Sequence, residues 1–119
     1  MAAPNIVNTT TITGRTAVAN STTTATAFLS NGAASNQVLK VNSVIVSNID
    51  GVADAVISID LFRSSVSYYL ARLITVPADS TLVVVSKDMG IYLEEGDSLR
   101  SLASVNGDLQ VVCSYEVIS

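Results

Sequence analysis

The side chains with catalytic potential are few in this chain, and histidine is absent from it. Without histidine the commonest general base and metal ligand is missing, and neither a Ser-His-Asp nor a Cys-His arrangement can form. The single cysteine, Cys113, lies in phase with the apolar residues Leu109 and Val111 and has no basic neighbour in sequence. A low-pKa nucleophile needs positive charge beside it, so we predict a buried, inert thiol here. These residues predict neither an enzyme nor a bound cofactor.

Three carboxylates gather around a glycine in the sequence Glu94-Glu95-Gly96-Asp97. Carboxylate oxygens are the ligands that Ca²⁺ prefers, and other aspartates could complete such a site. The aspartates in question are Asp50, Asp54 and Asp60. None of them follows the spacing of an EF-hand, and no aromatic residues flank the carboxylates as a sugar site would require. The pattern therefore favours a solvated polar corner before a strand, with Gly96 at positive φ, over a metal site.

Charge is scarce in this chain. Of its 119 residues, 49% are hydrophobic and 13% charged, whereas about 25% charged residues is usual in a soluble domain. The net charge is −4 and the basic residues are scattered, so the concentrated basic footprint that nucleic acid needs is missing. So few charges leave little polar cover for a solitary small protein. We therefore expect part of the exterior to be buried against copies of the chain or a partner.

The length suits one domain spanning residues 1–119. Within it, residues 1–36 are rich in Thr, Ser and Ala and contain one charged residue, Arg15, while residues 37–119 hold the stronger strand patterns. A single cysteine excludes an internal disulfide, and no apolar run approaches the ~20 residues of a membrane helix. The start of the chain lacks the pattern of a secretory signal peptide, so we expect folding in a reducing cytoplasm and no membrane partner.

Alternation of apolar and polar residues predicts about eight strands and no helix. The predicted strands are Ile6–Ile12, Thr24–Leu29, Val38–Asn48, Ala53–Arg63, Ser67–Val76, Thr81–Ser86, Leu99–Ala103 and Leu109–Ile118. Strands that follow one another through short turns pair antiparallel, and a chain of this size closes best as two packed sheets. We therefore predict a single all-β domain, an antiparallel β-sandwich of jelly-roll type.

Turn and bulge signals divide these strands. Thr13-Gly14-Arg15 is predicted to be a turn, and a change in apolar phase predicts a β-bulge near Asn42-Ser43. Thr81–Ser86 is continuously apolar, as strands at the centre of a sandwich are. Asn106-Gly107 is the two-residue signal of a type I′ turn, which predicts a hairpin between the last two strands.

Subunit contacts are expected from two parts of the chain. Residues 1–36 form either the first strands of the same sheet or an arm that pairs with a neighbouring subunit. The adjacent Tyr68 and Tyr69 face opposite ways on a strand, so one is expected in the core and the other outside, where tyrosine favours interfaces. The candidate interface residues are Ile6, Val7, Ile12, Phe28, Tyr68 and Tyr69.

The two ends of the chain carry the residues on which a family resemblance rests. They read MAAPNIVNTTTITGRTAVA (Met1–Ala19) and TLVVVSKDMGIYLEEGDSLRSLASVNGDLQVVCSYEVIS (Thr81–Ser119). Both resemble small β-rich virion proteins of tailed bacteriophages, notably marine and cyanobacterial phages, whose chains close on a similar pattern. This chain has Met89-Gly90 where that pattern has an apolar residue and proline. The corner L-x-x-G-D-x-L also recurs in other jelly rolls, including tumour-necrosis-factor-like modules.

The resemblance implies a structural role without chemistry. It implies a virion protein assembled in the host cytoplasm, first of all a capsid decoration (cement) protein that binds the major capsid protein as a homo-oligomer, expected to be a trimer. The alternative within the same particle is a neck, tail or fibre-base protein. A module that binds host glycans is an alternative of another class, for which aromatic residues, at 5% of the chain, are scarce. The resemblance brings no catalytic residue, cofactor or metal ligand to this chain.

Overall fold

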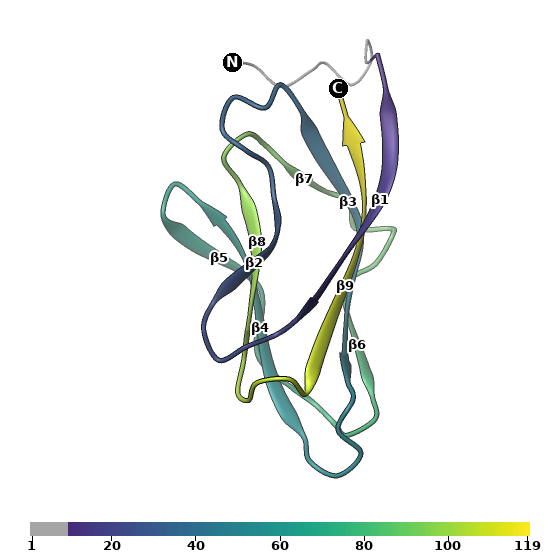
Figure 1. The fold of residues 1–119 in the computed structure, drawn as a ribbon, viewed down its shortest axis with the longest axis vertical. Helices are drawn as coiled ribbons and strands as arrows, with labels where there is room; N and C mark the ends of the chain where they lie inside the picture. The colour runs from purple at the N-terminus through teal and green to yellow at the C-terminus, as the bar shows by residue number, and fades with distance from the viewer. Residues whose placement is uncertain (1–9) are drawn as a thin grey trace.

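The computed structural model describes residues 10–119, which form two antiparallel β-sheets packed face to face (Figure 1). This confirms the prediction of an all-β sandwich. Residues 10–119 contain no helix that could cross a membrane. The strands of this part are β1 (Ile12–Asn20), β2 (Thr26–Ser30), β3 (Val38–Asn48), β4 (Ala55–Arg63), β5 (Val66–Val76), β6 (Thr81–Val85), β7 (Ile91–Leu93), β8 (Ser98–Ala103) and β9 (Leu109–Ile118).

The strand order is that of a jelly roll, as predicted. Sheet A has the order β1-β9-β3, with β6 and β7 both pairing along the free side of β3. Sheet B has the order β2-β8-β4-β5. Together β6 and β7 take the place of one strand that is interrupted at residues 86–90. Because the chain keeps crossing between the sheets, β4 and β5 are the one pair of consecutive described strands that form a hairpin.

The core lies between the two sheets and is almost wholly aliphatic. Alternate residues of the central strands point inward, and removing their surface from water at ~25 cal/mol per Å² is the main stabilising contribution. The fully buried side chains of these strands include Val41, Val44, Val46, Leu109, Val111 and Cys113 of sheet A and Ile57, Ile59 and Leu99 of sheet B. A register shift between Val41 and Ser43 confirms the predicted bulge and keeps Val41 and Val44 on one inner face.

The N-terminal segment provides an edge strand of sheet A. β1 pairs with β9 over its whole length, and Thr13-Gly14-Arg15 lies inside this ladder. The predicted turn at these residues is therefore wrong, because each of them finds a partner on β9 and the backbone stays extended. Residues 12–20 and 26–30 are thus strands of the chain's own sandwich, and an arm that pairs with a neighbouring subunit stays a prediction. Of the predicted strand Ile6–Ile12, residues 6–9 lie outside the described residues.

The segment between β8 and β9 crosses from sheet B to sheet A, so the predicted hairpin at Asn106-Gly107 is wrong. Gly107 does take a positive φ of 86°. Asn106 Oδ1 accepts a hydrogen bond of 2.8 Å from the backbone N–H of Thr23, so the dipeptide anchors a loop. The local turn signal is overridden because β9 forms longer ladders with β1 and β3.

β6 is an edge strand, which corrects the central position predicted for Thr81–Ser86. Among the described strands it pairs with β3 alone, and Val83 is 58% exposed. Val85 is fully buried. Some side chains of this apolar run therefore point into the core and others point into solvent. An unbroken apolar run did not indicate a strand that is buried on both faces.

The β4–β5 hairpin closes with a two-residue turn at Ser64-Ser65 and projects from the body of the sandwich (Figure 1). Both serines have positive φ, 51° and 61°, the backbone of a type I′ turn. The Cβ of serine disfavours this region, so the turn is strained. Further along β5, Arg72 and Leu73 lie together opposite Ser58 in a bulge, and Leu73 has a φ of 52°.

The residues that type I′ turns prefer should stabilise the hairpin. Ser64→Asn with Ser65→Gly relieves the strain at both positive φ values. We expect the free energy of unfolding to rise by about 1 kcal/mol. Urea unfolding followed by circular dichroism measures this change.

Ser86→Gly is the matched control, because Ser86 directly follows β6 and has no positive φ. There glycine only adds freedom to the unfolded chain, so the free energy of unfolding should fall slightly. Equal gains in the two proteins, or no gain in the double variant, would contradict a strained turn at Ser64-Ser65.

Candidate functional site

Tyr68 and Tyr69 are both about half exposed, at 55% and 51%. The prediction that one of them enters the core is wrong. Tyr68 does lie opposite Leu61, which packs against the core, but at this point the hairpin projects beyond the body of the sandwich (Figure 1). Tyr69 lies opposite Asp60 on the outer face of sheet B. Both rings are therefore available for contacts with another molecule.

The other predicted interface residues do not join the tyrosines in one surface. Ile12 is 58% exposed at the start of β1, in sheet A. Phe28 lies on β2 in sheet B and is half-buried against the core. Ile6 and Val7 lie outside the described residues. The structure therefore distributes the four described members of this predicted set over both sheets.

A row of apolar residues, which we call the apolar row, crosses the outer face of sheet A. Strand register places its members side by side on β1, β9, β3 and β6, in the order Val18, Val112, Ile45 and Val83. Their sequence neighbours Ala17, Val111 and Val44 pack in the core, so the row points outward. Val18 is 73% exposed and Val83 is 58% exposed. The sequence did not reveal this row, because register alone brings its distant members together.

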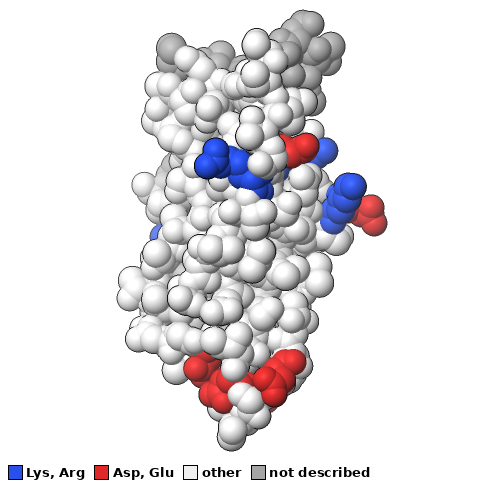
Figure 2. Space-filling model, turned by 45° about the vertical axis from the view of Figure 1, so that its right-hand side comes forward, with Lys and Arg blue, Asp and Glu red and all other residues white. Residues whose placement is uncertain are grey.

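Uncharged polar residues line one side of the apolar row. They are Asn20, Gln110, Ser47 and Thr81, one on each of the same four strands. Gln110 Nε2 donates to Asn20 Oδ1 at 3.2 Å, and the hydroxyls of Ser47 and Thr81 lie 3.1 Å apart. Figure 2 shows a broad uncharged area between a band of charged side chains and an acidic end of the molecule. This part of the outer face of sheet A thus offers a surface with few charges to desolvate.

The acidic end holds aspartates from three loops (Figure 2). They are Asp50, Asp54, Asp79 and Asp108, and hydrogen bonds between the loops hold these residues near one another. Hydrogen bonds from the N–H groups of Val52 and Ala53 hold the pKa of Asp50 below its usual value. Loss of hydration and the nearby charge of Asp50 raise the pKa of Asp108. Within residues 10–119, no three carboxylate or thiol side chains are grouped so that they could hold a metal ion.

Asp97 is buried and paired, which corrects the solvated corner predicted at Glu94–Asp97. It is 2% exposed, and Arg63 of β4 donates to both of its oxygens, with Nε 2.8 Å from Oδ1. The backbone N–H of Glu94 donates to Asp97 Oδ2, also at 2.8 Å. Glu94 pairs with the same Arg63, and Glu95 accepts a hydrogen bond from the N–H of Asn36. All three carboxylates are thus used within the chain.

The pKa of Asp97 reflects a competition between burial and these contacts. Burial alone would raise the pKa, but the hydrogen bonds from Arg63 and Glu94 and the charge of Arg63 outweigh it, so the pKa lies below its usual value. Gly96 turns the corner with a φ of 90°, as predicted. A carboxylate with a lowered native pKa stabilises the fold above the unfolded pKa and loses this contribution as pH falls through the native pKa.

Cys113 is fully buried on β9, as predicted. Burial raises the pKa of its thiol to about 12. Since the thiolate is the nucleophile, a thiol that stays protonated at neutral pH is inert in this position.

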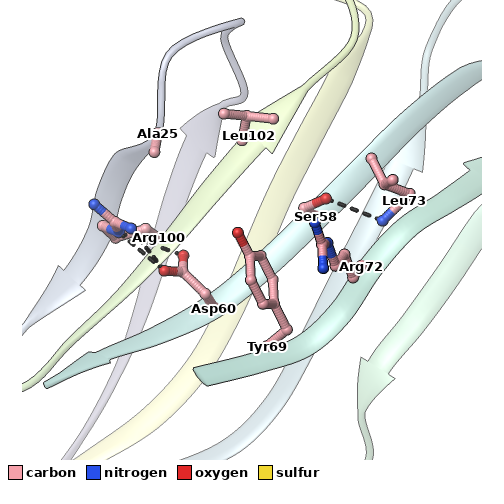
Figure 3. Close-up of a pocket in the computed structure, with 8 residues that line it drawn as sticks. All are labelled: Ala25, Ser58, Asp60, Tyr69, Arg72, Leu73, Arg100 and Leu102. Carbon is pink, nitrogen blue, oxygen red and sulfur yellow. Dashed lines mark hydrogen bonds and ion pairs between the residues drawn. The ribbon is translucent and has the colours of Figure 1, made fainter. Parts of the chain in front are cut away.

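The outer face of sheet B carries a shallow hollow of about 220 Å³ (Figure 3). Its floor is formed by Ser58 and Asp60 of β4, which are 6% and 5% exposed. Asp60 is held by Arg100 of β8, with Nη2 2.8 Å from Oδ2, and so lies apart from the acidic corner that it was considered to join. The remaining lining residues are Ala25, Tyr69, Arg72, Leu73 and Leu102. Of these, the sequence singled out Tyr69 alone.

Comparisons of the chain with protein-family models, with curated proteins and with solved structures found no match. The resemblance at the two ends of the chain therefore gains no support from them. The apolar row on sheet A and the hollow on sheet B are the two candidate functional sites.

Removing the charge of Asp97 should destabilise the fold, and the effect should fade in acid. Asp97→Asn breaks the paired hydrogen bonds with Arg63, which is 41% exposed, so water moderates the loss to about 2 kcal/mol at neutral pH. Below about pH 4 the wild-type protein loses this stabilisation as the pH falls through the lowered native pKa. Urea unfolding of both proteins from neutral to acidic pH measures the difference.

Glu94→Gln is the matched control, because Glu94 contacts the same guanidinium at 2.8 Å but its side chain is 66% exposed. Exposed ion pairs contribute about 0–1 kcal/mol, so little change is expected. Equal losses of unfolding free energy in the two variants would refute the stabilising role of the buried Asp97–Arg63 pair. A loss in Asp97→Asn that does not shrink in acid would refute it as well.

Proposed function

We propose that this protein is a structural component of a tailed-phage virion, specifically a capsid decoration (cement) protein. A homo-oligomer, a trimer, assembles in the host cytoplasm, binds the major capsid protein and stabilises the shell of the particle. The observation that carries this proposal is the apolar row on sheet A. The jelly-roll strand order, which viral capsid proteins and lectins share, and the resemblance of the chain ends to virion proteins support it.

The apolar row is suited to burial against another protein. Val18 and Val83 are large aliphatic side chains that remain mostly in water in the single chain. Burying apolar surface stabilises an interface by ~25 cal/mol per Å², and a standard interface covers ~800 Å² of each partner. A whole sheet face is needed for such an area, and the row supplies its apolar centre. The flanking polar residues share one hydrogen bond in each pair, and a partner would have to supply bonds to their remaining polar groups.

The use of charge in the described part of the chain favours a structural role. Arg63 and Arg100 are tied to the buried Asp97 and Asp60, and Lys40 pairs with Glu116 at 4.0 Å. Such pairs hold strands together and leave few groups free to move a proton. The protonated Cys113 adds no nucleophile. A protein that assembles in many copies needs a stable fold and surfaces that bind neighbouring subunits. The ion pairs contribute to the first requirement and the apolar row to the second.

One alternative rests on a specific observation of its own. The hollow on sheet B brings an exposed tyrosine, a carboxylate and two arginines together, which favours a host-glycan-binding sandwich. A neck, tail or fibre-base protein of the same particle would use the apolar row as a decoration protein does, and its position on the particle distinguishes it.

Charging the apolar row should abolish self-association. Val18→Lys with Val83→Lys places two ammonium groups where a partner would bury apolar surface, while both side chains already point into water and the fold should tolerate them. In analytical ultracentrifugation we expect the wild-type protein to sediment as an oligomer and this variant as a monomer.

Val52→Lys is the matched control, since Val52 is 92% exposed in the loop after β3 and lies outside the row. Its oligomer should be unchanged. A monomeric wild-type protein would overturn the oligomer proposal, and equal dissociation of the control would show that the row is not the interface.

Labelled copies on intact particles test the virion proposal directly. In electron micrographs of a phage whose genome carries this sequence, a decoration protein should mark regular positions over the whole shell. Purified protein should also bind shells that lack it, and the Val18→Lys, Val83→Lys variant should not. Label confined to the neck or tail would favour the alternative position, and particles without label would refute a virion role.

A further inference from the structure

The hollow on the outer face of sheet B contains polar groups that contacts between β4, β5 and β8 hold in place. Ser58 and Asp60 point outward from β4, yet both are more than nine-tenths buried because the side chains around them form walls (Figure 3). A buried ion pair such as Asp60–Arg100 stabilises a protein little better than apolar residues of the same size. This pair does, however, fix a guanidinium and a carboxylate in one orientation beside an open space.

Hydrogen-bond donors outnumber acceptors in this space. Arg100 uses Nε and Nη2 on Asp60, and Nη2 also donates to Ser67 at 2.8 Å. Arg72 has no carboxylate partner among the described residues. Ser58 Oγ accepts the N–H of Leu73 at 3.0 Å, which leaves its own proton free to donate. An occupant of the hollow would therefore have to supply acceptors.

The net charge of the side chains that line the hollow also favours an occupant with acceptor groups. Two guanidinium groups, Arg72 and Arg100, face one carboxylate, Asp60, so the local charge is +1 in a chain whose net charge is −4. A positive site on an otherwise acidic protein selects an anionic group.

Arg72 is held in place by its neighbours. Its guanidinium carbon lies 5.2 Å from the centre of the Tyr69 ring, within the range of a cation–π contact. The bulge that carries it has Leu73 at a φ of 52°, and the hydrogen bond to Ser58 fixes this backbone. A leucine in this conformation costs about 1–3 kcal/mol, and such strain gathers at ligand sites. The wall of the hollow is thus preorganised.

We propose that this hollow binds a sugar unit that carries a carboxylate. Its volume of about 220 Å³ is below the ~300–1,000 Å³ of sites for drug-sized ligands, so it suits a single ring. Arginine binds carboxylates through two parallel hydrogen bonds, which assigns the carboxylate to Arg72. Ser58, Asp60 and Tyr69 offer groups for ring hydroxyls, and the Tyr69 hydroxyl points into the space between the other two (Figure 3).

A sugar fits these groups better than an acidic peptide side chain does. A peptide carboxylate would use Arg72 and supply no acceptors for the hydroxyl protons of Ser58 and Tyr69, whereas ring hydroxyls both donate and accept. Leu73 and Leu102, at 65% and 37% exposure, offer apolar contact to the C–H face of a ring. This site lies on the sheet opposite the apolar row and does not depend on the virion proposal.

Titration of ¹⁵N-labelled protein with glucuronate tests the site, with glucose and glutamate as comparison ligands. Glucuronate should produce saturable shifts at the amides of Tyr69 and Leu73, since the Leu73 N–H is bonded to Ser58. Glucose lacks the carboxylate and glutamate lacks the ring, so both should bind at least about tenfold more weakly. Equal binding of glucose would refute the role of the carboxylate, equal binding of glutamate would refute the sugar, and no saturable shift would refute the site.

Variants locate the binding within the hollow. Arg72→Gln should weaken glucuronate binding about tenfold or more by removing the charged donor. Arg15→Gln removes the same charge from β1, outside the hollow, and should bind as the wild-type protein does. Tyr69→Phe keeps the ring beneath Arg72 and should weaken binding a few-fold through loss of its hydroxyl. Equal weakening by Arg72→Gln and Arg15→Gln would indicate a general effect of charge and would overturn the assignment.

Discussion

The position of β9 between β1 and β3 is the constraint on which the rest of the sandwich depends. Residues of β9 are paired on both sides along almost the whole strand. With the last strand in the middle of sheet A, the chain has to leave β8 in sheet B and cross over through residues 104–108. Inward side chains of β9 then pack on sheet B, and outward ones connect β1 with β3. The apolar row exists because Val112 of β9 lies between Val18 and Ile45.

Features that depend on residues close in sequence could be predicted, and features that depend on register could not. Alternation identified most strands, and the apolar phase located the bulge at Asn42. Asn106-Gly107 has the residues that a type I′ hairpin turn prefers. The partners of β9 are determined, however, by pairing along the whole strand with β1 and β3. The actual type I′ turn, Ser64-Ser65, lies at the connection predicted between Ala53–Arg63 and Ser67–Val76, but it lacks the residues that indicate this turn type. The burial of Asp97 was missed because its partner, Arg63, is distant in the chain.

Ion pairs add to the backbone ladders of sheet B near the base of the β4–β5 hairpin. Arg63 connects the end of β4 to the corner before β8, and Arg100 connects β8 to Asp60 on β4. The guanidinium of Arg100 also lies 3.9 Å from the centre of the Phe62 ring. The Arg63 and Arg100 ion pairs hold the base of the β4–β5 hairpin. The tip of this hairpin has no second sheet against it. The hollow is therefore placed where the sheet is kept rigid by polar contacts, which is the condition for a preorganised polar site.

The two outer faces can act together because they belong to different sheets. Stacked sheets lie ~10 Å apart, so a partner that covers the apolar row leaves the hollow of the same subunit in solvent. A hollow that accepts one sugar ring buries little surface and binds weakly alone. In an oligomer several hollows would be held at fixed spacing, and simultaneous binding of linked sites can strengthen attachment by about 10²–10⁴. Assembly through sheet A would thus give a weak site on sheet B the strength to hold a surface that presents many copies of its ligand.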